Sequence, residues 1–108
     1  MTHFYTWPDL PQTDMVPGIR RRLVSGEKVM VVQVTMDKGA MINAHHHPHE
    51  QMTHPISGVL ELEIDGETHI MRPGDVAHIP ANAPHCARAI EAVVTLDIFS
   101  PPREDFLT

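Results

Sequence analysis

Apolar and polar residues alternate along much of this chain. In residues 60–65 leucine, isoleucine and acidic side chains alternate strictly, as a β-strand with one buried face requires. Asp65 and Gly66 then offer a hairpin turn into a second strand over 67–71. The same alternation predicts strands at 29–36, 76–79, 85–90 and 92–99, with further strands at 18–24 and 56–59. No stretch shows a capped amphipathic helical pattern, so we expect an all-β fold: a sandwich, a jelly roll or a small barrel.

The first 17 residues lack this alternation and contain three prolines. We expect an irregular N-terminal arm over residues 1–17, packed on the body through Phe4, Tyr5 and Trp7. Residues 18–108 then form a single barrel domain with a C-terminal tail. A length of 108 residues agrees with one domain.

Charge and cysteine content narrow the class of protein. The chain has 8 Lys+Arg against 14 Asp+Glu, a formal net charge of −6, which argues against a nucleic-acid partner. The single cysteine, Cys86, cannot form an internal disulfide. The first residues do not read as a signal peptide, and no apolar run reaches the roughly 20 residues of a membrane helix. We therefore expect a cytoplasmic protein with no membrane partner.

Nine histidines stand out in this composition, and five of them lie within residues 45–54. Residues two apart on a strand share a face, so His45 and His47 are cofacial while His46 faces away. Gln51 follows four residues after His47, and His85 comes later, before the last expected strand. Three imidazoles and an amide oxygen could close around one divalent transition metal ion, and imidazole is a common ligand of such ions.

A second metal-ligand arrangement uses a neighbouring set of histidines. His47, His49 and His54 also have a suitable spacing, and residues 45, 47 and 49 share strand parity. Periodicity alone does not choose between the two sets.

The spacing of glycines, prolines and histidines resembles the cupin family. The first cupin motif matches Gly39, His45, His47, Gln51 and Gly58, with glutamine where glutamate is commoner. Gly74, Asp75, Pro80 and His85 look like the second motif. The resemblance runs from about residue 18 to the C-terminus and implies a double-stranded β-helix (jelly-roll) barrel that holds a divalent metal. It favours the first histidine set, because Gly39 stands at the expected distance and Pro48 interrupts the second set.

Within the cupins, the tail is similar to the pectin-degradation proteins. Residues 96–106 read LDIFSPPREDF, residues 45–51 read HHHPHEQ and residues 18–23 read GIRRRL. Those proteins open the ring of 4,5-unsaturated monouronates to linear keto acids. The resemblance implies metal ligands at His45, His47, Gln51 and His85, and substrate-handling residues at Asp97, Phe99 and Arg103.

The chain departs from this pattern at His54 and Pro55, where the family usually has an aromatic residue followed by an apolar one. A proline inside a strand removes a hydrogen-bond donor and predicts a sheet edge or a bulge there. The departure lies near the expected cavity, so it bears on the identity of the substrate.

The expected ligands also indicate the chemistry. Three neutral imidazoles and a neutral amide leave a divalent ion (Ni, Zn, Mn or Fe) with its full charge, which makes it a strong Lewis acid for an anionic substrate. We therefore expect a metal-dependent enzyme that opens or tautomerises a small unsaturated sugar acid. Asp97 would move protons, Arg103 would hold the carboxylate and Phe99 would shape the cavity wall.

Two other functions fit the same fold. One is a metal-dependent dioxygenase of a small organic substrate, which neutral ligands favour less because they stabilise trivalent iron poorly. The other is a non-catalytic metal- or ligand-binding module, which as a DNA-linked sensor would need a separate partner chain. We expect a homodimer, with the proline-rich arm or an edge strand at its interface.

Overall fold

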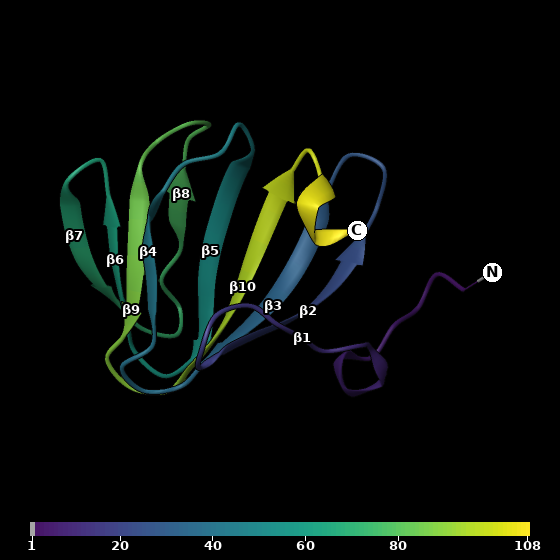
Figure 1. The fold of residues 1–108 in the computed structure, drawn as a ribbon, viewed down its shortest axis with the longest axis horizontal. Coiled ribbons are helices and arrows are strands. Elements are labelled where there is room, and N and C mark those ends of the chain that lie inside the picture. The colour runs from purple at the N-terminus through teal and green to yellow at the C-terminus, as the bar shows by residue number, and fades with distance from the viewer. Residues whose placement is uncertain (1) are drawn as a thin grey trace.

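The structure is a computed structural model that describes residues 2–108; Met1, the first residue of the predicted arm, lies outside the described residues. Within that range the chain forms ten β-strands in two antiparallel sheets and two short 3₁₀ helices (Figure 1). The all-β prediction is confirmed. Neither helix in the described range is long and apolar enough to cross a membrane.

The larger sheet has six strands in the order β1-β2-β3-β10-β5-β8. Their bounds are β1 (Thr13–Asp14), β2 (Ile19–Ser25), β3 (Met30–Met36), β10 (Val93–Ser100), β5 (Glu50–Ser57) and β8 (Ala77–Ile79). The smaller sheet has four strands in the order β4-β9-β6-β7. These are β4 (Met41–His45), β9 (His85–Ala89), β6 (Leu60–Ile64) and β7 (Glu67–Met71), and the 3₁₀ helices are η1 (Trp7–Asp9) and η2 (Glu104–Phe106).

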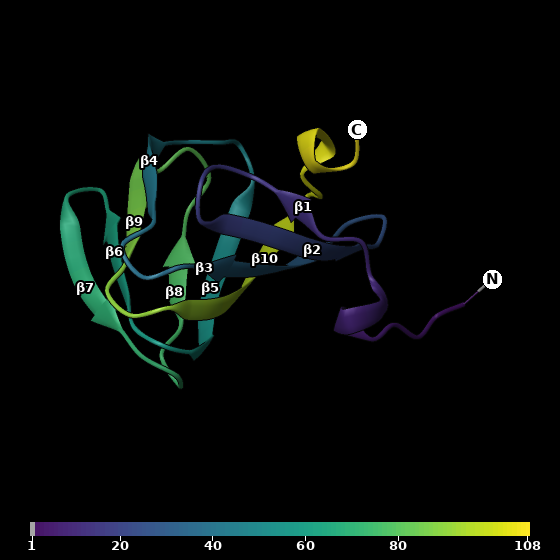
Figure 2. The same cartoon turned by 60° about the horizontal axis from the view of Figure 1, so that its bottom comes forward.

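The two sheets form two layers with the core between them (Figures 1 and 2). Burial alternates along β3 and β10, because every second side chain points inward. Met30, Val32 and Val34 of β3 meet Leu60 and Leu62 of β6 in one apolar cluster. On β10 the same alternation turns Thr95, Asp97 and Phe99 inward, and all three are buried. The strand pattern that buries the core therefore also carries polar groups into it.

Strand β5 reaches further than the expected segment 56–59, which proves to be no separate strand. It runs from Glu50 to Ser57, and Gly58 then turns the chain with a φ of 84°. A Cβ at Gly58 would lie 2.0 Å from the carbonyl oxygen of Ala92, so only glycine fits this turn.

The prediction of a bulge at Pro55 is confirmed, although β5 lies between β10 and β8 and is not an edge strand. The register between β5 and β10 shifts between Val94 and Thr95, beside the Pro55 pairing. On its other side, β5 pairs with β8 only over residues 51–53. Pro55 therefore has no partner strand on that side, and its missing N–H leaves no hydrogen bond unmade there.

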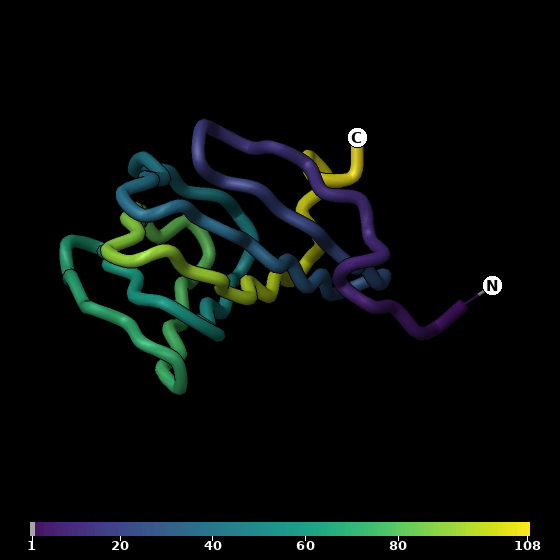
Figure 3. The backbone as a smooth tube through the Cα atoms, turned by 90° about the horizontal axis from the view of Figure 1, so that it is seen from below, coloured from purple at the N-terminus to yellow at the C-terminus, as the bar shows by residue number. Residues whose placement is uncertain are grey.

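The N-terminal arm differs from the expectation in two ways. Phe4 is 87% exposed and Tyr5 is 54% exposed, so the prediction that they pack on the body is wrong. Figures 1 and 3 show this segment running away from the sheets. The arm is also not wholly irregular, because it contains η1 and the short strand β1. Trp7, the third aromatic residue of that prediction, is half-buried. Firm attachment of the arm comes from β1, which pairs with β2, and from Met15, which packs against the core.

Candidate metal centre and ligand cavity

A cavity of about 590 Å³ lies between the two sheets and is lined by residues of both. Its wall is apolar toward the core, where Val34, Met36, Leu60 and Leu62 contribute. Its polar lining consists mainly of the residues singled out in the sequence. These are His45, Gln51, His85, Asp97 and Arg103, together with Asn43, Thr53 and Thr95. A mostly apolar cavity with a few convergent polar groups is typical of a small-molecule site.

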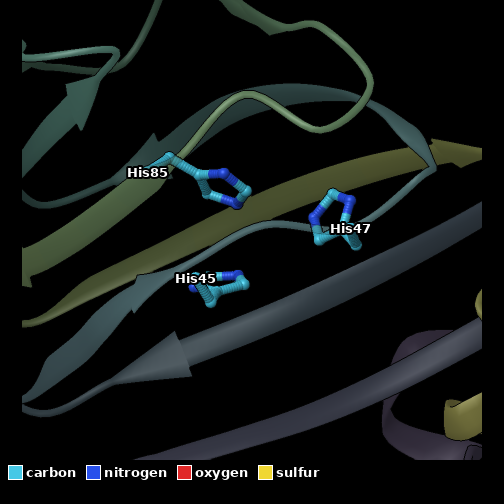
Figure 4. A group of neighbouring side chains, drawn as sticks. All are labelled: His45, His47 and His85. Atoms are coloured by element: carbon cyan, nitrogen blue, oxygen red, sulfur yellow. The ribbon is translucent and has the colours of Figure 1, made fainter.

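Three histidines converge at this cavity (Figure 4). His45 ends β4 and His85 begins β9, and the two are direct partners in the antiparallel pairing. His47 follows in the loop between β4 and β5 and is 7% exposed. One candidate ligand atom from each of the three lies within 4.8 Å of the others. The sheet pairing thus joins the two cupin-like motifs at one point.

Backbone carbonyls orient all three rings. Each Nδ1 lies 2.8–3.1 Å from a carbonyl oxygen, which can only accept a hydrogen bond. A proton on Nδ1 therefore suits each ring and leaves the Nε2 lone pair free for a metal. The carbonyls belong to Asn43 for His45, to His49 for His47 and to Ala83 for His85. Nε2 of His85 is buried with no hydrogen-bond partner.

Gln51 is oriented by a chain of side-chain hydrogen bonds. Thr53 Oγ1 donates to Asp97 Oδ1 at 3.0 Å, so its oxygen is available to accept from Gln51 Nε2 at 2.9 Å. This turns Gln51 Oε1 toward His47, 3.1 Å from Nε2. Both Gln51 and Thr53 are buried, and they point inward from alternate positions of β5.

The contact between His47 and Gln51 tests whether a metal fits. A neutral imidazole carries one proton, yet the two nitrogens of His47 face two acceptors, the His49 carbonyl and Gln51 Oε1, each at 3.1 Å. A second proton is disfavoured, because burial and the charges of Arg103 and His85 lower the pKa of His47 to about 4. A cation beside Nε2 and Oε1 satisfies both lone pairs. The donor set of three imidazole nitrogens and one amide oxygen therefore fits a divalent transition metal.

Asp97 lies next to this donor set, on the neighbouring strand β10. Burial raises its pKa to about 6, although the hydrogen bonds from Thr53 and Gln51 and the charge of Arg103 oppose the rise. Thr53 donates a hydrogen bond to its Oδ1, whereas the guanidinium of Arg103 pairs with Asp105, so Asp97 and Arg103 do not form an ion pair. A carboxyl group that titrates near neutral pH inside a cavity can both accept and donate a proton.

Arg103 and two aromatic rings form the outer part of the cavity. The guanidinium carbon of Arg103 lies 4.3 Å from the ring centre of Phe106 and 5.2 Å from that of Phe99. Arg21 stacks on Phe106 as well, at 4.0 Å. The carboxylate of Asp105 offsets one of these two guanidinium charges, so this end of the cavity keeps a net positive charge, which suits an anionic ligand.

The guanidinium of Arg103 is also paired with Asp105. Its Nε and Nη2 donate to the two carboxylate oxygens at 3.1 and 2.9 Å, and this hydrogen bond lowers the pKa of Asp105. The pair holds Arg103 in place and leaves Nη1 free to donate to a ligand.

The second histidine set does not assemble. His54 has the parity of Met52 and Ile56 on β5, which are exposed on the outer face, whereas Gln51 and Thr53 point inward. The ring centres of His49 and His47 lie 5.3 Å apart. The part of His49 that contacts His47 by a hydrogen bond is its backbone carbonyl, which accepts from His47 Nδ1. His46 is exposed, as predicted.

The sequence analysis missed three residues of the site: Thr53, Phe106 and Arg21. Thr53 follows Gln51 by two residues on one strand, so parity could have placed it on the inner face. Phe106 lies in the C-terminal segment that resembles the pectin-degradation proteins. Only the tertiary fold shows that Arg21 of β2 meets this tail.

Comparison with known proteins places this site in a family. The model of the cupin domain matches residues 32–99, which include the three clustered histidines and Gln51, Asp97 and Phe99. The pectin degradation protein KdgF of Dickeya dadantii is 32% identical over 99% of this chain and 100% of its own length.

Solved structures agree with this match along nearly the whole chain. KdgF from a Halomonas species superposes with a TM-score of 0.93 at 32% identity, covering 98% of this chain and 99% of that one. An RmlC-like cupin from Shewanella frigidimarina has the same TM-score at 29% identity, covering 98% and 96%. The chain therefore belongs to the cupin domain family and, within it, resembles the pectin degradation protein KdgF along its full length.

Proposed function

We propose that this protein is a metal-dependent enzyme that opens or tautomerises a 4,5-unsaturated monouronate to a linear keto acid. The observation that carries the proposal is the convergence of His47 Nε2 and Gln51 Oε1, two lone pairs with no proton to share, beside the buried carboxyl of Asp97. The likeness to KdgF over the whole chain supports the substrate class. In this proposal the two sheets form a jelly-roll barrel around the site, and residues 1–17 form an arm whose last part, from β1 onward, joins the larger sheet.

The metal ligands in this proposal are His45, His47, Gln51 and His85. A divalent ion of Ni, Zn, Mn or Fe, when bound, supplies a positive charge that polarises oxygen atoms of the substrate. All four ligands are uncharged, so none of that charge is cancelled. This favours acid and base chemistry over the dioxygenase alternative.

The reaction needs two proton movements, which Asp97 performs. Opening the hemiacetal ring needs a base to take the proton of the anomeric hydroxyl: the aldehyde C=O forms as the bond between the anomeric carbon and the ring oxygen breaks, and the ring oxygen leaves as an enolate. A proton delivered to the adjacent ring carbon then turns the enolate into the ketone. A single carboxyl group with a pKa of about 6 takes the first proton and returns one to carbon, so atoms and charges balance.

Arg103 and Phe99 position the substrate for this step. The free Nη1 of Arg103 holds the carboxylate, and the cationic end of the cavity favours an anion over a neutral sugar. Phe99, 3% exposed and two residues from Asp97 on the inner face of β10, forms an apolar part of the cavity wall beside Arg103. This wall excludes water from the proton-transfer site.

The direct test follows the ultraviolet absorbance of the conjugated double bond in an unsaturated monouronate, with metal-loaded protein. We expect the parent to consume the substrate and Asp97→Ala to lose at least about 100-fold in rate, in line with the usual contribution of a general acid or base. Asp14→Ala, which removes an exposed carboxylate of β1, is the matched control and should keep the parent rate. No turnover by the parent would refute the substrate; unchanged turnover by Asp97→Ala would remove Asp97 from the mechanism.

We also propose that the protein works as a cytoplasmic homodimer. The outward residues of β10, Val94, Leu96 and Ile98, are apolar and only half-buried, and Phe4 and Tyr5 of the arm are exposed. A second copy that covers both would bury this apolar surface. Sedimentation should show a dimer that Leu96→Asp converts to a monomer; a monomeric parent would contradict the proposal.

A further inference from the structure

The inner faces of β5 and β10 form a ladder of three side-chain pairs that descends into the cavity. Gln51 stands opposite Phe99, Thr53 opposite Asp97, and Pro55 opposite Thr95. In the middle pair a hydroxyl donates to the carboxylate. In the deepest pair a proline ring faces a hydroxyl group, so the opposite strand offers Thr95 no polar partner.

Thr95 is the one member of this ladder whose polar atom is left without a hydrogen bond. Its side chain is 3% exposed, Oγ1 is buried with no partner, and the residue lines the cavity. Burying a hydroxyl without a partner costs free energy. A valine would fill the same space without that cost, as Val93 does two residues earlier on the same face. The hydroxyl is therefore costly to the fold and available to a ligand.

The position of Thr95 relative to the charged groups indicates which part of a ligand it meets. Thr95 lines the cavity together with Arg103, Phe99 and Asp97, and it lies two residues from Asp97 on the inner face of β10. Two residues of a strand span about 7 Å, so a sugar ring placed at Asp97 reaches Thr95. The part of the ligand that Thr95 meets is therefore the ring.

We propose that Thr95 is a specificity-determining residue: its Oγ1 hydrogen-bonds a ring hydroxyl of the substrate. The inference rests on the proposed function and deepens it, because it restricts the substrate to hydroxylated ring acids. A cavity with only Arg103 and a metal ion would accept many small carboxylates. The buried hydroxyl discriminates against ring acids without hydroxyls, since these leave it unpaired.

The test compares three variants by calorimetry and kinetics in the metal-loaded protein. Thr95→Val removes only the hydroxyl and keeps the side-chain shape, Thr95→Ser retains the hydroxyl, and Thr35→Val removes a hydroxyl from the outer face of β3 as the matched control. The binding probes are D-galacturonate and tetrahydropyran-2-carboxylate, ring acids with and without ring hydroxyls.

We expect Thr95→Val to weaken galacturonate binding about tenfold and to raise KM for the unsaturated monouronate by a similar factor, with kcat within about twofold of the parent. Binding of tetrahydropyran-2-carboxylate should stay the same or improve. Thr95→Ser should restore most of the galacturonate affinity, and Thr35→Val should resemble the parent. A general defect in folding would weaken both probes and would not be rescued by serine.

Different failures refute different claims. Equal loss of both probes, or no loss of galacturonate affinity in Thr95→Val, overturns the role of Thr95 while leaving turnover by the parent intact. If galacturonate binding depends on Thr95 but the parent does not turn over the monouronate, the proposed reaction is refuted. The hydrogen bond between Thr95 and a ring hydroxyl is then still supported. A metal-loaded parent that binds neither acid overturns the inference.

Discussion

Replacing Asp97 by asparagine removes the charge of a buried carboxylate while keeping its shape, and we expect it to stabilise the metal-free protein. The pKa of Asp97 rises from an ordinary 3.8 to about 6, mainly because burial penalises the charged form. Each pKa unit corresponds to about 1.4 kcal/mol, so ionised Asp97 lowers the free energy of unfolding by about 3 kcal/mol. Asparagine avoids that cost, and its Oδ1 can still accept the Thr53 hydrogen bond.

The pH dependence of the stability difference tests whether the charge of Asp97 is its cause. Because the folded pKa of Asp97 lies above the unfolded one, the contribution of this residue to stability is most favourable below about pH 3.8 and is lost as pH rises through 6. The asparagine variant does not titrate there. Its advantage over the parent should grow from about 1 kcal/mol at pH 4.5 to about 3 kcal/mol at pH 8, since the other groups cancel in the difference.

Urea unfolding at both pH values, with a chelator present, measures this difference. Asp14→Asn, at an exposed carboxylate, should change stability by less than about 0.5 kcal/mol at either pH. An Asp97→Asn variant no more stable than the parent at pH 8, or one whose gain is the same at both pH values, would refute the reasoning. With metal and substrate the same variant should be inactive, because asparagine moves no proton.

The remaining predictions concern the groups around the metal site. Thr53→Val breaks the chain that orients Gln51, so metal affinity in a chelator-competition assay should fall about 10- to 100-fold; unchanged affinity would show that Gln51 is positioned otherwise. Gln51→Glu places a negative charge on the metal, so affinity should rise while kcat falls at least about tenfold; a faster variant would contradict the role given to the uncharged ligands. Arg103→Lys loses the planar guanidinium that pairs with Asp105 and stacks on Phe106, so KM should rise about tenfold with a smaller change in kcat; an unchanged KM would place the carboxylate elsewhere.

Strand periodicity predicted much of the fold because burial in a two-layer β protein alternates with the backbone. The expected strand 92–99 corresponds to β10, and its inward parity correctly grouped Asp97 with Phe99. His46 is exposed as predicted, but strand parity is not the reason, because β4 ends at His45 and both His46 and His47 lie in the following loop. Parity left His54 undecided, because the loop at Pro48 and His49 interrupts the count between His47 and β5.

Features that depend on the pairing of distant strands could not be predicted in the same way. The register of β5 against β10 places Thr53 opposite Asp97 and Pro55 opposite Thr95. This register depends on how two distant segments pair, so it could not be predicted from the local sequence of either strand. The arm illustrates a different error: its aromatic residues predicted packing, but Phe4 precedes the first strand pairing, at Thr13, and is exposed to solvent.

The central claim is that three histidines and Gln51 hold one metal ion. Elemental analysis of the protein, as purified and after dialysis against divalent transition metals, tests it most directly, with His47→Ala as the control. We predict about one metal ion per chain in the parent and little in the variant, because His47 supplies a lone pair that has no other partner. A parent that carries no metal and takes up none, or a variant that binds as much as the parent, would contradict the account.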